Sequence, residues 1–211
     1  MKKAVIILII FAVITGSCKV QKSPATHEKG VVINGIKWAT RNVDEFGTFA
    51  PTPESEGKIY QWNRKIAWNT TDKAVDWDYS LPEDKKWTKA NDPSPAGWRV
   101  PTFDEIKTLL DTTKVEYKWV VQNSVRGGKF TDKRNGNSIF LPAVGTRDCN
   151  DSKLKNETLD GNYWSSTPKL RIPSYYQHYY YLLFDYFDRN EGAKYRSNVG
   201  NNGFSVRSVA K

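Results

Sequence analysis

Arg99-Val100-Pro101-Thr102-Phe103-Asp104-Glu105 carries the clearest local signal in the sequence. Thr102 can cap the N-terminus of a helix, and Glu105, three residues later, completes a capping box. Apolar side chains then recur with helical spacing on one face, at Ile106, Leu109 and Leu110. The stretch therefore predicts a helix over about 103–111.

Short strand signals lie on both sides of this helix. The apolar run Val31–Ile33 precedes the turn dipeptide Asn34-Gly35, and Ile36–Thr40 begins with alternating apolar and polar residues. Thr113–Val121 is rich in β-branched and aromatic residues and is ambiguous between helix and strand. The other expected strands are Ile59–Trp62, Ser138–Pro142, Tyr163–Ser166, Tyr179–Phe187 and Gly203–Val209.

One long segment, residues 63–95, shows no periodicity and is expected to be irregular, with Trp68, Trp77 and Trp87 packing it onto the body. A loop of this length is unusual unless it has a function. Short strands and a helix, mixed with much loop, indicate an α+β fold.

Composition narrows the class of protein. The chain has 211 residues, 13% of them aromatic, which is too many for a disordered chain. Two cysteines exclude a disulfide-dense scaffold and a zinc site made of four cysteines, and two histidines leave little room for histidine-based catalysis. The net charge of +9 bears on solubility and non-specific binding rather than on fold.

The N-terminus resembles a bacterial lipoprotein signal. Lys2 and Lys3 precede the apolar run Ala4–Ile14, which is shorter than the roughly 20 residues that span a bilayer. Thr15-Gly16-Ser17-Cys18 resembles a lipobox, in which the cysteine becomes the lipidated first residue; a plain signal peptide with a chance cysteine is the alternative. We expect a signal at 1–17, a lipidated Cys18 with a tether over 18–29, and one domain over 30–211.

This reading places the chain in the bacterial cell envelope, anchored by lipid at the outer membrane, on its periplasmic or surface side. Removal of residues 1–17 takes away two lysines and lowers the charge from +9 to +7. It also leaves Cys149 as the only thiol beyond Cys18, so no intramolecular disulfide is expected. No basic run is interleaved with stacking aromatics, and nucleic acid is not an expected partner.

Five blocks, in order, resemble the Fibrobacter succinogenes major paralogous domain, a family of secreted and lipoprotein domains. The blocks are Gly35–Val43, Asp92–Thr102, Gly136–Ala143, Tyr163–Thr167 and Gly203–Arg207. The family resembles the C-type lectin-like fold, which formylglycine-generating enzymes and retroelement-diversified ligand-binding proteins also use. The resemblance implies that fold, with short, mostly antiparallel strands, one or two helices and extensive loops.

The sequence departs from the family at three positions where relatives often carry cysteine: Arg41, Ser94 and Ser208. If the cysteines at the last two positions pair in relatives, this chain has lost both ends of that disulfide together. Its core must then hold by packing, which the large aromatic side chains make feasible.

Catalysis and metal binding find little support. Formylglycine-generating enzymes use a cysteine pair, which one remaining thiol cannot supply, and the acidic neighbour of Cys149 would raise its pKa. His178 lies in a tyrosine run and is expected to pack or face solvent. Two acidic clusters lack the spacing of a calcium loop and are interpreted as solvated: Asp148, Asn150 and Asp151, and Asp185, Asp188, Asn190 and Glu191. We therefore expect no enzyme activity, cofactor or metal.

Binding is the strongest functional reading. The tyrosine-rich segment 174–187 is followed by the polar segment 194–202, and Tyr beside Asn, Ser and Arg is typical of antibody paratopes. In the lectin-like relatives, the corresponding segment forms the ligand face. Alternate residues of a strand face opposite sides. The resemblance implies that Tyr180, Leu182 and Phe184 point inward, which would turn Tyr179, Tyr181, Leu183 and Asp185 outward. The expected ligand-binding residues are Tyr175, Tyr176, Tyr179, Tyr181, Asp185, Lys194, Arg196, Asn198, Asn201 and Asn202.

The ligand of this face is expected to be a glycan or a protein. The alternative is a core of aromatic residues beside an ordinary surface loop. A structural or assembly component of a surface complex is the second functional reading, and an enzyme of the formylglycine-generating type is the third. The oligomeric state is left open.

Overall fold

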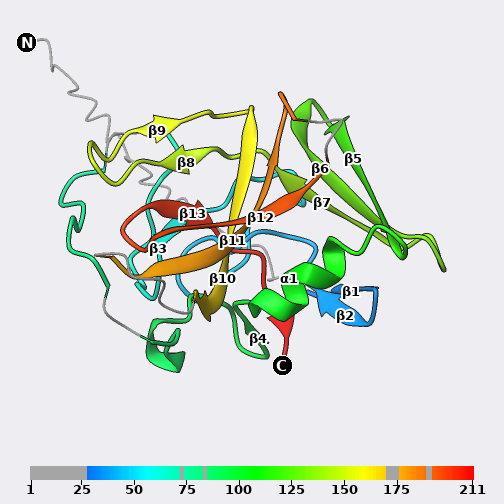
Figure 1. The fold of residues 1–211 in the computed structure, drawn as a ribbon, viewed down its shortest axis with the longest axis horizontal. Helices are drawn as coiled ribbons and strands as arrows, with labels where there is room; N and C mark the ends of the chain where they lie inside the picture. The colour runs from blue at the N-terminus through cyan, green and yellow to red at the C-terminus, as the bar shows by residue number, and fades with distance from the viewer. Residues whose placement is uncertain (1–27, 72–73, 83–84, 170–175, 189–191) are drawn as a thin grey trace, which may run out of the picture.

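The computed structural model describes residues 28–71, 74–82, 85–169, 176–188 and 192–211 (Figure 1). Within them, fourteen strands form three sheets, and the α-helical content is one helix of seven residues. The expected α+β, C-type lectin-like fold is therefore wrong: the protein is β-rich. The one predicted helix is present but short, and the ambiguous segment 113–121 forms a strand, so pairing between strands dominates the fold. In these ranges no helix is long and apolar enough to cross a membrane.

The first sheet joins the two ends of the described chain. Its strand order is β1-β2-β14-β4. The predicted turn Asn34-Gly35 connects β1 to β2, and both residues have positive φ (45° and 83°), as a two-residue hairpin turn requires. The strands are β1 (Val31–Ile33), β2 (Ile36–Trp38), β4 (Trp98–Arg99) and β14 (Val209–Ala210).

The second sheet is the largest and has the order β12-β11-β10-β13-β8-β9, with β3 also pairing with β13. Its pairs are antiparallel except β10 with β13. The expected strand Gly203–Val209 is interrupted, so that its start lies here and its end lies in the first sheet. The strands are β3 (Ile59–Gln61), β8 (Thr146–Arg147), β9 (Leu154–Lys155), β10 (Asp160–Pro168), β11 (His178–Asp185), β12 (Lys194–Val199) and β13 (Gly203–Ser205).

The third sheet is a meander of β5 (Val115–Gln122), β6 (Val125–Asp132) and β7 (Ser138–Pro142). The ambiguous segment of the sequence is thus a strand. Gly127 and Gly128 lie inside β6. A Cβ at Gly127 would come within 2.2 Å of the Leu141 carbonyl oxygen. Gly127 therefore permits a close approach of the backbone, and at Gly128 a Cβ would come within 2.9 Å of the Tyr117 ring.

Helix α1 (Phe103–Leu109) confirms the predicted capping box. Thr102 Oγ1 accepts a hydrogen bond from the Glu105 amide at 3.3 Å, and the Glu105 carboxylate accepts one from the Thr102 amide at 2.7 Å. Arg99 adds an ion pair to Glu105 at 2.5 Å. The buried side chains Ile106 and Leu109 hold the helix against the sheets.

The core consists of three adjoining clusters of buried side chains. Phe184 lies at the centre of the largest, where its ring is within 6.2 Å of four aromatic rings. Trp62, Trp164 and Tyr179 form the second cluster, and Tyr60 belongs to the third. The irregular segment packs onto the body as expected. Trp87 contacts Trp62, and Trp68 contacts the buried Trp77. A 3-10 turn, η1 (Lys89–Asn91), follows Trp87 along the chain.

The lowered pKa values of two carboxyl groups, Glu28 and Glu105, predict that the free energy of unfolding falls in acid. Burial alone would raise the pKa of Glu28, but hydrogen bonds from Arg41, Thr40 and Gly30 outweigh it and lower the pKa below 4.5. Burial alone would also raise the pKa of Glu105. Hydrogen bonds from Arg99 and Thr102 outweigh this effect, so the pKa of Glu105 is lowered as well.

A carboxyl with a depressed folded-state pKa contributes stability that is complete above its unfolded pKa and is lost as the pH falls through the folded value. We therefore expect the urea midpoint to fall between pH about 5 and pH about 3. Glu28→Gln combined with Glu105→Gln should lower the midpoint at neutral pH and flatten this acid dependence. An equally steep dependence in the double variant would contradict the assignment.

Candidate functional site

The predicted binding residues are distributed over β11, β12 and the turn that follows. Cys18 and Tyr175 lie outside the described residues. Tyr176 is 56% exposed just before β11. The strand register places Tyr181 opposite Arg196 and Tyr179 opposite Asn198, so the structure brings these four side chains to one face of the sheet.

That face is largely covered, which corrects the expected outward orientation of two tyrosines. Tyr179 is 0% and Tyr181 9% exposed. The Trp62 ring stacks on Tyr179 with centroids 3.7 Å apart, and Phe204 lies 4.6 Å from Tyr181. Strand alternation correctly groups these side chains, but both faces of β11 are covered by other elements.

The side chains expected to turn inward differ in how deeply they are buried. Leu182 and Phe184 are buried as predicted, at 1% and 0% exposure. Tyr180 is only half-buried, and its ring stacks on Phe103 of helix α1 with centroids 3.9 Å apart. The stack therefore lies at the boundary between the core and the surface.

Asn201 and Asn202 belong to the framework rather than to an open loop. They are 8% and 6% exposed. The Asn201 side chain donates to the Tyr79 carbonyl at 3.0 Å, and Asn202 Oδ1 accepts from the Cys149 amide at 3.2 Å. Their polar atoms thus join distant loops, and the prediction that both contact a ligand is not supported by their burial.

A row of charged side chains crosses the outer end of the same face. Asp160 and Asp185 are directly opposite on β10 and β11, and Lys194 lies 3.9 Å from the Asp185 carboxylate and also pairs with Asp188. Burial raises the pKa of Asp160 to about 6, against hydrogen bonds from Asn156 and Asn162 that lower it, and with a smaller upward contribution from Asp185. Lys194 therefore neutralises this acidic corner and is engaged within the protein.

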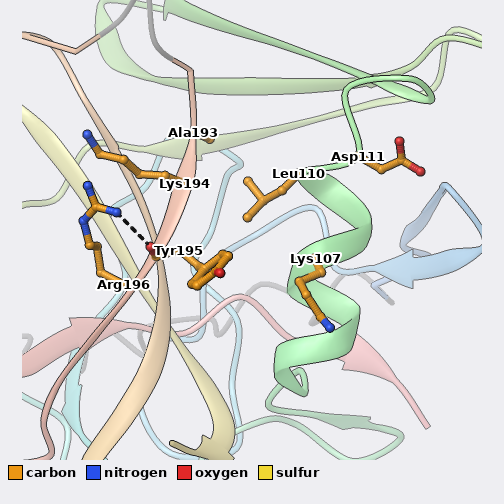
Figure 2. A pocket seen from close by; sticks show the side chains of 7 residues that line it. All are labelled: Lys107, Leu110, Asp111, Ala193, Lys194, Tyr195 and Arg196. Carbon is orange, nitrogen blue, oxygen red and sulfur yellow. Dashed lines mark hydrogen bonds between the residues drawn. The ribbon is translucent and has the colours of Figure 1, made fainter.

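A cleft of about 570 Å³ opens on the other face of β12, between that strand and helix α1 (Figure 2). Figure 2 shows Tyr195 and Leu110 pointing into the space, whereas Lys194 and Arg196 extend from the opposite side of β12. The cleft is lined by Lys107, Leu110, Asp111, Ala193, Lys194, Tyr195 and Arg196. Edge strand β12 thus presents an aromatic side chain to one side and cations to the other.

Tyr195 forms the wall of this cleft and is 49% exposed. Its ring meets Phe103 edge-to-face at 4.9 Å, and Phe103 in turn stacks on Tyr180. Lys107 Nζ lies 5.0 Å from the Phe103 ring centroid and pairs with Asp104 at 2.7 Å. The result is a fixed aromatic platform with a cation at its edge.

Sequence reasoning identified Lys194 and Arg196 in this region but missed Tyr195, Phe103 and Lys107. The alternation Lys194-Tyr195-Arg196 was a usable signal, because it places the tyrosine on the face opposite the two cations. The contribution of α1 had no such signal, since it depends on how the helix packs on β11.

The other candidate groups have structural surroundings. Burial and then Asp148 raise the pKa of the Cys149 thiol, the predicted direction. Lys155 pairs with Asp148 at 2.9 Å and with Asp151 at 3.5 Å. Burial and then Lys169 lower the pKa of His178. Among the described residues, no group of three His, Cys, Asp or Glu side chains is placed to hold a metal ion; Asn190 and Glu191 lie outside them.

Comparison of the chain with protein-family models, with curated proteins and with solved structures finds no match.

Proposed function

We propose that the protein is a non-enzymatic binding protein that recognises a glycan in the cleft between α1 and β12. The observation that carries the proposal is the exposed Tyr195 ring, held edge-to-face by the stacked Phe103 and Tyr180 rings. Sugar rings present apolar C–H faces and a rim of hydroxyl groups. A rigid, half-exposed aromatic ring beside charged groups suits both parts of such a ligand.

The polar groups around the platform support the same proposal. Arg196 is exposed, and its guanidinium donates to the Tyr195 carbonyl at 3.3 Å. No carboxylate within the described residues forms an ion pair with it. Its side chain extends from the face of β12 opposite Tyr195, so its remaining N–H groups are available to a ligand that continues from the cleft around this edge strand. Asp111 at the other end of the cleft already accepts from the Thr113 hydroxyl at 2.6 Å and pairs with Lys114 at 3.4 Å, so its carboxylate is engaged within the protein.

The described groups around Tyr195 are compatible with a binding role. Lys107 is already paired with Asp104, and Tyr195 shows no activating base at hydrogen-bond distance among the described residues. Attachment to the envelope through Cys18 stays a prediction from the sequence, and the binding proposal does not depend on it.

Replacing Tyr195 tests the proposal. A glycan array probed with the purified full chain would first identify a binding sugar, and titration calorimetry would then measure its affinity. Tyr195→Ala should weaken binding about tenfold, because an aromatic contact contributes about 1–1.5 kcal/mol beyond burial. Tyr79→Ala is the matched control, since Tyr79 is 54% exposed and does not line the cleft.

Three results would contradict the proposal. They are unchanged affinity in Tyr195→Ala, an equal loss in Tyr79→Ala, and an array without signal accompanied by tight binding of a protein at the cleft. Tyr181→Ala is unsuitable as a test, because removal of that buried ring would disturb the core.

A further inference from the structure

Strand β5 has a free edge at the outer side of the molecule, at the right of Figure 1. β6 pairs with it along all eight residues, and within the described ranges no strand pairs with its other side. Long unpaired edges are templates for another chain, and proteins commonly shorten, bend or cover them. This edge shares no lining residue with the cleft between α1 and β12.

The turn after β5 shows which backbone groups point outward. Asn123 and Ser124 have φ of 47° and 68°, which makes a two-residue turn whose flanking pair is hydrogen-bonded. Hydrogen-bonded pairs then alternate along the ladder, and the bond from the Lys133 amide to the Lys114 carbonyl, 2.8 Å, follows the same alternation. The outward groups with no hydrogen-bond partner in the described part of the chain belong to Tyr117, Trp119 and Val121.

The side chains of these residues form an apolar surface that continues from the core into solvent. The Trp119 ring lies 6.2 Å from the buried Phe184 ring and 5.9 Å from Tyr186. Val121 is 64% exposed and Phe187, next to Tyr186, is 79% exposed. The inner part of this surface is therefore rigid, while its outer part is unusually open for large apolar side chains.

Charge on the other face of β5 indicates what would approach. Lys118 stands directly opposite Lys129 of β6, a pairing of like charges that is unfavourable by itself. Lys118 has one carboxylate nearby, Glu116 on its own strand, at 3.0 Å. On the apolar side, the Arg126 guanidinium lies 5.8 Å from the Tyr186 ring centroid. A further strand would therefore pair more favourably with β5 if that strand carried acidic residues.

We propose that β5 accepts an extended segment of a partner protein by β-strand addition, and that apolar residues alternate with acidic residues in that segment. Its backbone would pair with Tyr117, Trp119 and Val121, its apolar side chains would lie against Trp119 and Val121, and its acidic side chains would lie beside Lys118. Backbone pairing supplies affinity in this mode, and alternate side chains supply specificity. A second copy of the chain fits less well, because the protein carries a net charge of +9.

A labelled seven-residue peptide of alternating Val and Asp, titrated with the full chain by fluorescence polarisation, is the probe. Saturable binding is expected. Val121→Pro removes an outward N–H without removing a bond to β6, and Val121→Ala keeps that N–H as the matched control. Val121→Pro should bind at least tenfold more weakly than Val121→Ala, and Lys118→Glu should lose the Val/Asp peptide and gain a Val/Lys peptide.

Peptide N-methylation tests the backbone pairing without altering the protein. Methylating alternate amides in one register should abolish binding, and shifting the methyl groups by one residue should preserve it. Absence of saturable binding, equal affinities of Val121→Pro and Val121→Ala, or equal effects of the two methylation registers would overturn the proposal. Concentration-dependent dimerisation that Val121→Pro abolishes, without peptide binding, would also overturn it and assign the edge to a second copy.

Discussion

A disulfide engineered between positions 94 and 208 is expected to form spontaneously and to stabilise the protein. Ser94 Oγ and Ser208 Oγ lie 2.8 Å apart and share a hydrogen bond, so Ser94→Cys and Ser208→Cys would bring two sulfur atoms within bonding reach after a small adjustment. The bridge would close a loop of roughly 100 residues, for which chain entropy predicts about 4.7 kcal/mol; strain usually reduces the gain to about 2–4 kcal/mol.

Urea unfolding of the oxidised and reduced double variant would measure this gain, with each single variant as a control. Cys149→Ser in the background removes a half-buried competing thiol. Free thiols at both positions under oxidising conditions would contradict the expected geometry, as would an oxidised form no more stable than the reduced one. The same contact is notable because the family resemblance implied that cysteines at these two positions could pair in relatives.

Asn42→Ala is expected to destabilise the fold by about 3 kcal/mol or more, because it would leave a buried charge without its side-chain acceptor. Arg207 is 1% and Asn42 0% exposed. Asn42 Oδ1 accepts from Arg207 Nε at 3.0 Å and from Nη2 at 2.7 Å, and Nη1 donates to the Ala39 carbonyl at 3.2 Å.

The Asn42 amide also holds the surrounding structure, since its Nδ2 donates to the Glu56 carbonyl at 2.8 Å and to the Tyr163 hydroxyl at 3.3 Å. Burial lowers the pKa of Arg207 to about 10, so the side chain stays charged at neutral pH. The cost of leaving this buried charge without Asn42 therefore applies over the whole physiological pH range.

A double-mutant cycle separates the charge from the packing. In an Arg207→Met background, Asn42→Ala should cost at least about 1 kcal/mol less than in the parent, because no charge is then left unpaired. Equal losses in the two backgrounds, measured by urea unfolding, would show that the arginine does not depend on Asn42.

Local signals in the sequence predicted the elements whose causes are local. The capping box at Thr102 and Glu105 and the turn at Asn34-Gly35 act within a few residues, and both are present as predicted. The ambiguity of 113–121 was real, because its β-branched and aromatic residues suit a strand only when β6 lies beside it. Local signals do not explain why Gly127 lies inside a strand, because the reason, the close Leu141 backbone, lies on another strand.

The candidate site shows the same division. Strand alternation correctly predicted which side chains of β11 share a face, yet it cannot say which face remains open. The Trp62 ring covers Tyr179, and helix α1 leaves a cleft beside Tyr195, and both facts depend on elements far away in the chain.

The sequence by itself determined the helix start, the turn at Asn34-Gly35 and the alternation of side chains along the strands, because capping, turn chemistry and side-chain alternation are short-range effects. Only the tertiary structure decided the β-rich architecture, the burial of Tyr179 and Tyr181, the contact of Ser94 with Ser208 and the free edge of β5. These features arise from pairing and packing between distant segments, and such contacts depend on how the whole chain buries its aromatic side chains at once.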